Sequence, residues 1–251
     1  MSDWSDLADE LDAWHREGRR AHFWWRDDDA TRITPPLLQL LELSVRHDTP
    51  VALAVIPRDA EEGLRQHLLE CPLATVLQHG WSHENHAPAG GRQEEFGVHR
   101  SLPVMLSELA EGWRHIQRFS RAEPVLVAPW NRLDPHLLPH LPSVGLCAVS
   151  TLGPRPTAVP APGVRQTNVH VDLIDWPGTR GFRGDGPVLA QILAHLRARR
   201  CGQADHDEPT GVMSHHSFHD SGCWAFLNEL LAATRTHPAV RWLAAREAFR
   251  R

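Results

Sequence analysis

Residues Gln78 to His86 read Gln-His-Gly-Trp-Ser-His-Glu-Asn-His and follow Ala74 to Leu77, a short apolar run typical of a buried strand. Three imidazoles fall within this stretch, and neutral imidazole is the commonest protein ligand for zinc-like ions. The chain has 18 histidines, so this stretch alone leaves a solvated loop as good an interpretation as a metal site. It indicates a strand whose end carries candidate ligands.

A second apolar run ends in an acidic segment. Ala21 to Trp25 is a candidate for a buried strand, and it leads directly into Arg26-Asp27-Asp28-Asp29-Ala30. Three adjacent carboxylates repel one another unless a cation lies among them. Together with the histidine stretch, this segment favours a metal site built at the ends of two strands.

Apolar runs alternate with helical patterns along the rest of the chain. Strands are predicted at His22 to Arg26, Val51 to Ile56, Ala74 to Leu77, Val125 to Ala128, Leu146 to Thr151, Asn168 to Ile174 and Gly211 to Ser214. Helices are predicted at residues 35–45, 59–71, 102–119, 187–200 and 223–236, with a proline-punctuated one around Leu137 and Leu141. Seven strands alternating with helices predict an α/β fold with a parallel sheet, open or closed into a barrel.

The length of 251 residues suits a single domain that spans residues 1–251. A helix that Ser2 or Ser5 caps and Gly18 ends is expected to pack on it, within residues 1–20. The predicted strands end in polar residues at the face where parallel α/β barrels assemble their sites. These residues are Asp28, Asp29, His79, His83, Pro129, Trp130, Asp175 and His215.

Composition argues against several classes of partner. The net charge of −5 gives no basic stripe, so neither nucleic acid nor an anionic membrane is expected. No apolar run approaches the length of a membrane span, and the first residues lack the pattern of a secretion signal, which favours the cytoplasm. The four cysteines are too far apart for a zinc knuckle or a disulfide framework: Cys71, Cys147, Cys201 and Cys223.

Five segments resemble, in order, the five motifs of the polysaccharide deacetylase family, also called carbohydrate esterase family four. They are residues 26–30, His79 to His83, Pro129-Trp130, Asp172 to Trp176 and Met213-Ser214-His215, within a likeness that runs from Phe23 to His219. The resemblance implies a distorted (β/α)7-type barrel with parallel strands. It also implies one divalent ion and the removal of acetyl groups from N- or O-acetylated carbohydrate. Zinc is the expected metal, with cobalt, nickel or manganese as alternatives.

The resemblance assigns a role to each matched residue. It makes Asp28 the general base and His215 the general acid, with Asp29, His79 and His83 as metal ligands. The backbone N–H of Trp130 would stabilise the oxyanion, in a corner that also holds Pro129 and Asn131, while Asp175 and Trp176 would contact the substrate.

Some residues keep alternative interpretations. Asp27 is the functional carboxylate if the motif is shifted by one residue, although strand alternation then points the wrong pair of side chains inward. His86 is either a ligand or a plain loop residue. Asp172 and Asp175 are either structural or functional, and Trp176 is either a core residue or a wall of the acetyl pocket. Glu95 and Phe96 either reach the substrate or belong to an ordinary surface loop. Arg26, His216 and His219 are candidates to orient a catalytic group.

The sequence also departs from the family pattern. Val127 stands where the family has an arginine that contacts the base, so the charge beside Asp28 must come from elsewhere, with Arg26 and Arg132 as candidates. Three functions stay open: a hydrolase of an acetylated small molecule or oligosaccharide, a catalytically silent relative that binds a glycan or partner, and a hydrolase of a non-sugar amide. The sequence does not set the oligomeric state.

Overall fold

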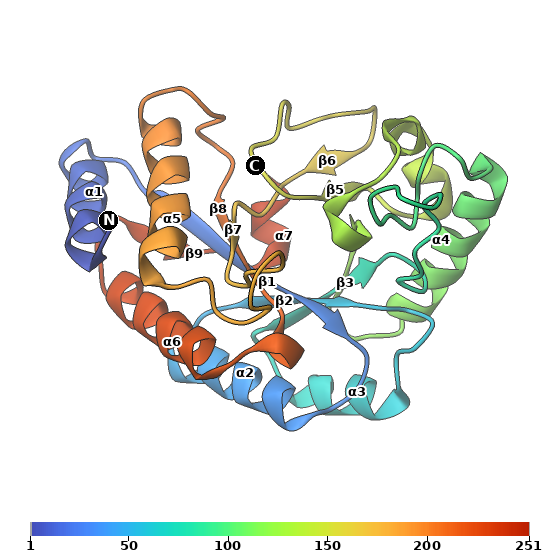
Figure 1. The fold of residues 1–251 in the computed structure, drawn as a ribbon, viewed down its shortest axis with the longest axis horizontal. Helices are drawn as coiled ribbons and strands as arrows, with labels where there is room; N and C mark the ends of the chain where they lie inside the picture. Colours follow the sequence, from blue (N-terminus) through green and yellow to red (C-terminus); the bar gives the residue numbers. More distant parts are fainter. Residues whose placement is uncertain (1, 251) are drawn as a thin grey trace.

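A computed structural model describes residues 2–250, which fold around one curled parallel sheet (Figure 1). The sheet has nine strands in the order β6-β5-β4-β3-β2-β1-β8-β7, and β9 pairs with the start of β1. The strands are β1 (Ala21–Ala30), β2 (Val51–Val55), β3 (Ala74–His79), β4 (Ala122–Val127), β5 (Ala148–Ser150), β6 (Arg165–Gln166), β7 (Val171–Asp172), β8 (Thr210–Ser214) and β9 (Val240–Trp242).

One extended segment, residues 165–173, joins the two ends of the sheet. On one side the N–H of Thr167 donates to the carbonyl of Val149, next to β5. On the other side the N–H of His170 donates to the carbonyl of Gly211 in β8. The sheet therefore curls into a distorted barrel of parallel strands, which confirms the predicted fold class.

Most helices cover the outside of the barrel, and the last one packs against residues inside it (Figure 1). The helices are α1 (Trp4–Arg16), α2 (Pro35–Arg46), α3 (Glu62–His67), α4 (Leu102–Ile116), α5 (Asp185–Arg200), α6 (Ser221–Arg235) and α7 (Ala245–Ala248). Short 3-10 turns lie at η1 (Leu68–Glu70), η2 (Pro129–Asn131), η3 (Pro135–Val144) and η4 (His216–Phe218). Helix α1 packs against α5, and no helix within residues 2–250 is long and apolar enough to cross a membrane.

Side-chain alternation along the strands produces two apolar layers. In β1, Phe23 and Trp25 point outward into the core beneath the helices, whereas Trp24 points into the barrel with Ala52 and Ala54 of β2. At the amino-terminal ends of the strands, Phe249 packs edge-on against Trp24, with ring centroids 5.4 Å apart. The barrel is thus filled at that end, and its polar residues gather at the carboxyl-terminal end.

Several element boundaries differ from the prediction. The cap of α1 is Asp3, not Ser2 or Ser5, because its carboxylate accepts the N–H groups of both Ser5 and Asp6. Strand β1 continues through the acidic run, since β2 and β8 pair with it beyond Trp25.

Short elements were the least predictable. The predicted helix at 59–71 is split into α3 and η1. Of the predicted strand from Asn168 to Ile174, only β7 pairs regularly, with β8. The preceding strand β6 pairs with β5 instead. Strand β9 was not predicted, because a run of three residues carries too little periodicity to be recognised.

Candidate active site

A pocket of about 480 Å³ opens at the carboxyl-terminal ends of the strands. Many of the predicted residues line it: Asp28, Asp29, His79, His83, Trp130, Asn131, Asp172, Trp176 and His215. They come from segments more than 180 positions apart in the sequence, so the barrel topology brings them together.

The end of β1 departs from regular strand geometry. Alternation would place Asp28 and Asp29 on opposite faces of the sheet. Instead, Asp29 adopts a left-handed conformation with φ of 73°, and the pairing of β1 with β2 shifts between Asp27 and Ala30. Aspartate tolerates this region better than most residues. The irregularity lets two consecutive carboxylates line the same pocket.

The three residues predicted as metal ligands lie together. Asp29 Oδ1 is 3.1 Å from His79 Nε2 and 3.4 Å from His83 Nε2, and the candidate ligand atoms all lie within 4.8 Å of one another. An ion could therefore contact all three at once, as the Asp-His-His sets of catalytic metal sites do.

The hydrogen bond of His79 fits a bound cation. His79 Nδ1 lies 3.1 Å from the carbonyl oxygen of Val127, which can only accept, so Nδ1 carries the proton. The lone pair of Nε2 then faces Asp29 Oδ1, which is also an acceptor. A proton or a metal ion is needed between these two atoms, and a histidine held by a carbonyl at its second nitrogen is usual for metal ligands.

The pKa values of these groups follow from their closeness. Burial alone would raise the pKa of Asp29, but the hydrogen bond and charge of His79 bring it well below its usual range. Burial likewise lowers the pKa of His79, whereas Asp29 and Asp28 more than offset this and raise it overall. Burial, followed by the charge of His79, lowers the pKa of His83 and favours the neutral ring that ligates metals.

Asp28 forms a buried two-point ion pair with Arg26. Arg26 Nε lies 2.8 Å from Asp28 Oδ1, and its Nη2 lies 2.9 Å from Oδ2. The same guanidinium donates to Ser150 Oγ and to Asn131 Oδ1. Arg132 instead donates to the carbonyl of Gln93. Of the two candidates for the charge missing at Val127, the structure places Arg26 beside Asp28.

His215 shares the pocket with Asp28. Its Nε2 lies 4.0 Å from Asp28 Oδ2, and its ring stands edge-on to Trp176 with centroids 4.9 Å apart. Trp176 is held in turn by Asp172, whose Oδ2 accepts its indole N–H at 2.8 Å. Burial raises the pKa of Asp172. Asp28 and His215, the two residues with predicted proton-transfer roles, therefore face the same pocket.

Asp27 lies on the other side of the strand, outside the pocket. Its carboxylate accepts from His216 Nδ1, from the N–H of His216 and from Ser214 Oγ. Burial raises the pKa of Asp27, but the charge and hydrogen bond of His216 lower it overall. The shifted register that would have made Asp27 a pocket residue is wrong. His219 packs against Trp224 behind this pair, and burial lowers its pKa to about 4.

Three other predicted residues do not line the pocket. Asp175 builds a turn, because its carbonyl accepts the N–H groups of Gly178 and Arg180 and its carboxylate accepts that of Thr179. Pro129 is buried in η2. His86 pairs through its backbone with Glu94 and belongs to no described cluster of potential ligands, which agrees with a plain loop residue.

Trp130 and Asn131 bound the site through backbone geometry. Both residues are left-handed, with φ of 52° and 56°, and the ring of Trp130 packs on His83 with centroids 4.3 Å apart. The pocket is also lined by residues that the sequence did not single out: Gln93, Leu152, Arg180 and Phe218. Glu95 and Phe96 do not belong to the pocket lining, and both side chains are fully buried.

A second group of potential ligands lies at the start of β8 and is formed by His170, His195 and Glu208. The N–H of Gly211 donates to His170 Nδ1, so the proton of the neutral ring is on Nε2, 3.3 Å from a carboxylate oxygen of Glu208. A protonated nitrogen cannot ligate. His170 therefore cannot ligate a metal ion through Nε2 in this arrangement, and burial raises the pKa of Glu208 to about 7.

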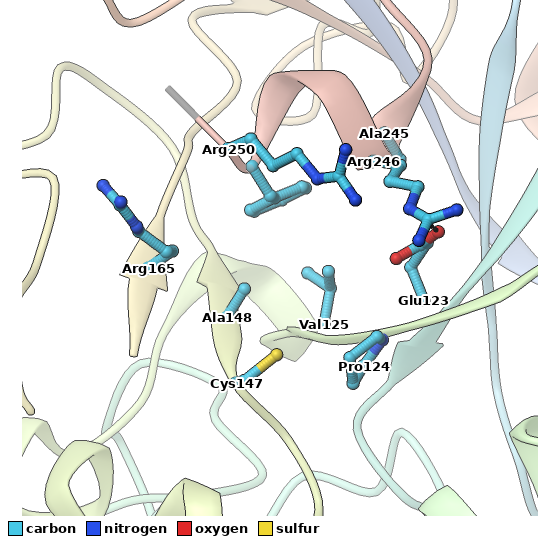
Figure 2. A pocket seen from close by; sticks show the side chains of 10 residues that line it. Glu123, Pro124, Val125, Cys147, Ala148, Arg165, Ala245, Arg246 and Arg250 are labelled. Carbon is cyan, nitrogen blue, oxygen red and sulfur yellow. Dashed lines mark ion pairs between the residues drawn. The ribbon is translucent and has the colours of Figure 1, made fainter. Parts of the chain in front are cut away.

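A second pocket, of about 340 Å³, lies at the amino-terminal ends of β4, β5 and β6, opposite the candidate site. Figure 2 shows Arg246 above Glu123, and their charged groups are 3.9 Å apart. Cys147 lines the same pocket. None of the predicted site residues lies there.

No family model and no curated protein matches the sequence. Solved structures do match. A protein from Mycobacterium smegmatis assigned as a polysaccharide deacetylase is 16% identical, with a TM-score of 0.63 over 91% of this chain and 88% of that one. The chain has the polysaccharide deacetylase fold.

Other structures with this fold differ in activity. A family 4 acetyl xylan esterase from Clostridium thermocellum, in complex with a cobalt ion, is 13% identical, with a TM-score of 0.55 over 91% of this chain and 90% of that one. A CE4 family pseudoenzyme from Bacillus anthracis is also 13% identical, with a TM-score of 0.59 over 92% and 66% of the two chains. The polysaccharide deacetylase fold therefore occurs in esterases and in a pseudoenzyme.

Proposed function

We propose that the chain is a metal-dependent hydrolase that removes an acetyl group from an acetylated carbohydrate. The observation that carries this proposal is the convergence of Asp29, His79 and His83, next to Asp28 and His215, in one pocket. A site that only bound a metal would need neither a base nor an acid beside it.

Asp29, His79 and His83 would hold the ion, and zinc suits two imidazoles and one carboxylate. When bound, a divalent cation polarises a carbonyl oxygen and lowers the pKa of water. Three protein ligands leave positions free for water and for the acetyl oxygen. The hydrogen bond from His79 to the carbonyl of Val127 keeps the ligating nitrogen pointed inward.

Asp28 and His215 would transfer the protons. Asp28 would take the proton of the attacking water, and Arg26 fixes its orientation through two hydrogen bonds. His215 would then donate a proton to the leaving nitrogen or oxygen of the sugar. The backbone N–H of Trp130 would stabilise the negative oxygen of the tetrahedral intermediate. Trp176 and Trp130 line the pocket and would limit the access of water to it.

The test is acetate release from a panel of N- and O-acetylated sugars and non-sugar acetamides. We expect wild type to release acetate, whereas Asp28→Asn and His215→Ala keep their zinc and lose at least about a hundredfold in kcat, the effect of one proton-transfer group. His79→Ala should lose both zinc and activity. Equal activity of Asp28→Asn and wild type would contradict the assigned mechanism.

A catalytically silent protein that binds a glycan or a partner is the second candidate. The pseudoenzyme from Bacillus anthracis supports it, because that protein keeps the fold. Wild type that binds zinc but releases no acetate from any member of the panel would favour this candidate. Release only from acetamides that are not sugars would favour a hydrolase of non-sugar amides.

A further inference from the structure

The turn between the two histidine ligands has an unfavourable backbone. Gly80 and His83 are left-handed, with φ of 60° and 56°. Between them, the N–H groups of Trp81, Ser82 and His83 point to the same side of the turn, where a single acceptor can bind all three. A turn of this kind forms a concave site for an anion.

Glu95 supplies that anion. Its Oε1 accepts the N–H of Ser82 at 2.7 Å, that of Trp81 at 3.2 Å and the Ser82 hydroxyl at 3.1 Å. Its Oε2 accepts the N–H of His83 at 3.3 Å. The side chain is completely buried, and a Cβ atom placed on Gly80 would lie 2.0 Å from Oε2. The carboxylate therefore fills the turn and excludes any side chain at position 80.

Glu95 is itself fixed from the opposite side. Arg100 donates to its carbonyl oxygen at 3.1 Å and forms an ion pair with Glu108 of α4 at 2.7 Å. The next residue, Phe96, is fully buried, and its carbonyl accepts the N–H of Asp134 at 2.7 Å. The carboxylate thus reaches the turn from a rigid support.

We propose that Glu95 is a positioning residue that holds His83 in its metal-ligating geometry. His79 needs this support less, because it ends β3 and its Nδ1 is bound to Val127. His83 has no such strand, and its backbone N–H is bound by Glu95. The proposal rests on the proposed metal site.

The test compares Glu95→Gln with Glu94→Gln. The first change keeps the shape but turns one acceptor into an NH2 donor that faces backbone N–H groups. The second is a matched control, because Glu94 pairs at 3.5 Å with His99 and not with the turn. We expect the zinc Kd of Glu95→Gln to rise about 10- to 100-fold, as for other residues that orient ligands. The Kd of Glu94→Gln should stay within about twofold of wild type.

A double variant separates positioning from general stability. In the His83→Ala background, adding Glu95→Gln should cause little further loss of zinc affinity, because the two changes act through one ligand. Glu95→Gln that melts earlier than wild type but keeps its zinc Kd would overturn the proposal.

Amide hydrogen exchange tests the turn without any metal. The amides of Trp81, Ser82 and His83 should exchange at least about tenfold faster in Glu95→Gln than in Glu94→Gln, since they lose a charged acceptor. Unchanged exchange would contradict the role of Glu95. If wild type binds no zinc while the two variants show the expected difference in exchange, the metal site is contradicted. Glu95 is then still the residue that orders the turn.

A different observation concerns charge in the pocket. Arg132 and Arg180 come from separate loops and line the same pocket as the candidate ligands. Neither forms an ion pair with a carboxylate of residues 2–250: Arg132 donates to the carbonyl of Gln93, and Arg180 lies over Trp176 at 6.0 Å. Both guanidiniums are available to a ligand.

The carboxylates nearby are already bound. Asp28 is paired with Arg26, and Asp172 accepts from Trp176 and from the N–H of Ile174. With a divalent ion on Asp29, the pocket carries excess positive charge. Planar guanidiniums favour carboxylates and phosphates, which they bind through two hydrogen bonds.

We infer that the substrate of the proposed hydrolase carries a phosphate or carboxylate group. Three substrates, each assayed with the zinc-loaded protein, distinguish the two kinds of anion: N-acetylglucosamine, its 1-phosphate, and N-acetylmuramic acid, which carries a carboxylate. We expect kcat/KM to be at least about tenfold higher for an anionic sugar than for the neutral one, about the effect of one charge-assisted hydrogen bond.

Arginine variants locate the effect. Arg132→Gln and Arg180→Gln should each remove most of this preference, whereas Arg92→Gln, an exposed change of equal charge outside the pocket lining, should not. Equal kcat/KM for neutral and anionic sugars, or a preference that survives both pocket variants, would overturn the inference. If no sugar releases acetate, the affinities of the same three sugars, measured by calorimetry, test the preference for an anion independently of the proposed hydrolase activity.

Discussion

At the scale of single residues, the buried ion pair of Arg26 and Asp28 fixes the orientation of the proposed base. Both side chains are at most 3% exposed, so neither charge can be stabilised by water. Breaking a buried ion pair by removing one partner costs about 3 to 5 kcal/mol, because the other charge stays buried and uncompensated. Arg26 therefore supports both the fold and the orientation of the proposed base.

We expect Arg26→Met to lower the free energy of unfolding by about 3 to 5 kcal/mol, measured by urea denaturation. Arg26→Met combined with Asp28→Asn should recover part of this loss, because no charge is left unpaired. Arg132→Met is the control and should change stability by about 0.5 kcal/mol or less. Equal losses in the single and double variants would contradict the importance of the pair.

The pair of Asp27 and His216 predicts a pH dependence of stability. The lowered pKa of Asp27 gives stability that is present above its ordinary value of 3.8 and is lost as pH falls. Burial lowers the pKa of His216, but Asp27 raises it overall, which gives stability present below 6.5 and lost as pH rises through the raised value. The ion pair should thus contribute most between these limits.

We expect His216→Gln to cost about 1.5 to 3 kcal/mol near pH 5.5, the value of a hydrogen bond between charged groups, and less near pH 9. His219→Gln is the matched control, because the lowered pKa of His219 keeps it neutral over this range and its cost should not shrink. Unfolding curves at both pH values measure the difference. A cost of His216→Gln that is the same at both would show that charge is not involved.

The sequence predicted many residues of the site and fewer of their supports. Asp28, Asp29, His79, His83 and His215 follow from motifs at strand ends, and all line one pocket. The choice between Arg26 and Arg132 needed coordinates, because both lie near the site in sequence. The role of Glu95 depends on a loop that folds back onto the turn, and no local pattern records such a contact.

At the scale of secondary-structure elements, α7 closes the barrel opposite the candidate site. Phe249, directly after α7, packs on Trp24 inside the barrel and is 7% exposed. Periodicity predicted the long helices and the buried strands well, because their patterns extend over many residues. It missed β9 and α7, which are too short to show a period and are held by tertiary contacts.

We expect Phe249→Ala to lower the free energy of unfolding by about 3 kcal/mol, the usual cost of emptying a buried aromatic site. Its zinc Kd should stay near that of wild type, since α7 lies at the other end of the barrel. Arg250→Ala, an exposed neighbour, should change stability by about 0.5 kcal/mol or less. A loss of zinc affinity in folded Phe249→Ala would contradict this separation of the two ends.

At the scale of the whole molecule, the barrel separates packing from chemistry. Apolar side chains fill the layer beneath the helices and the barrel at the amino-terminal ends of its strands. The irregular carboxyl-terminal ends of the strands carry the polar groups. The fold could be predicted because strand and helix patterns alternate along the chain. The same fold occurs in the Bacillus anthracis pseudoenzyme, so the fold alone does not decide the activity.

The central claim is that Asp29, His79 and His83 bind one divalent ion, and zinc stoichiometry of purified protein tests it most directly. We expect one zinc per chain in wild type and in His86→Ala, which removes a nearby histidine outside the ligand cluster. Asp29→Ala, His79→Ala and His83→Ala should each retain well below one zinc per chain, with much weaker affinity, while remaining folded. Wild type without zinc affinity, or His86→Ala that loses zinc as fully as His83→Ala, would contradict the account.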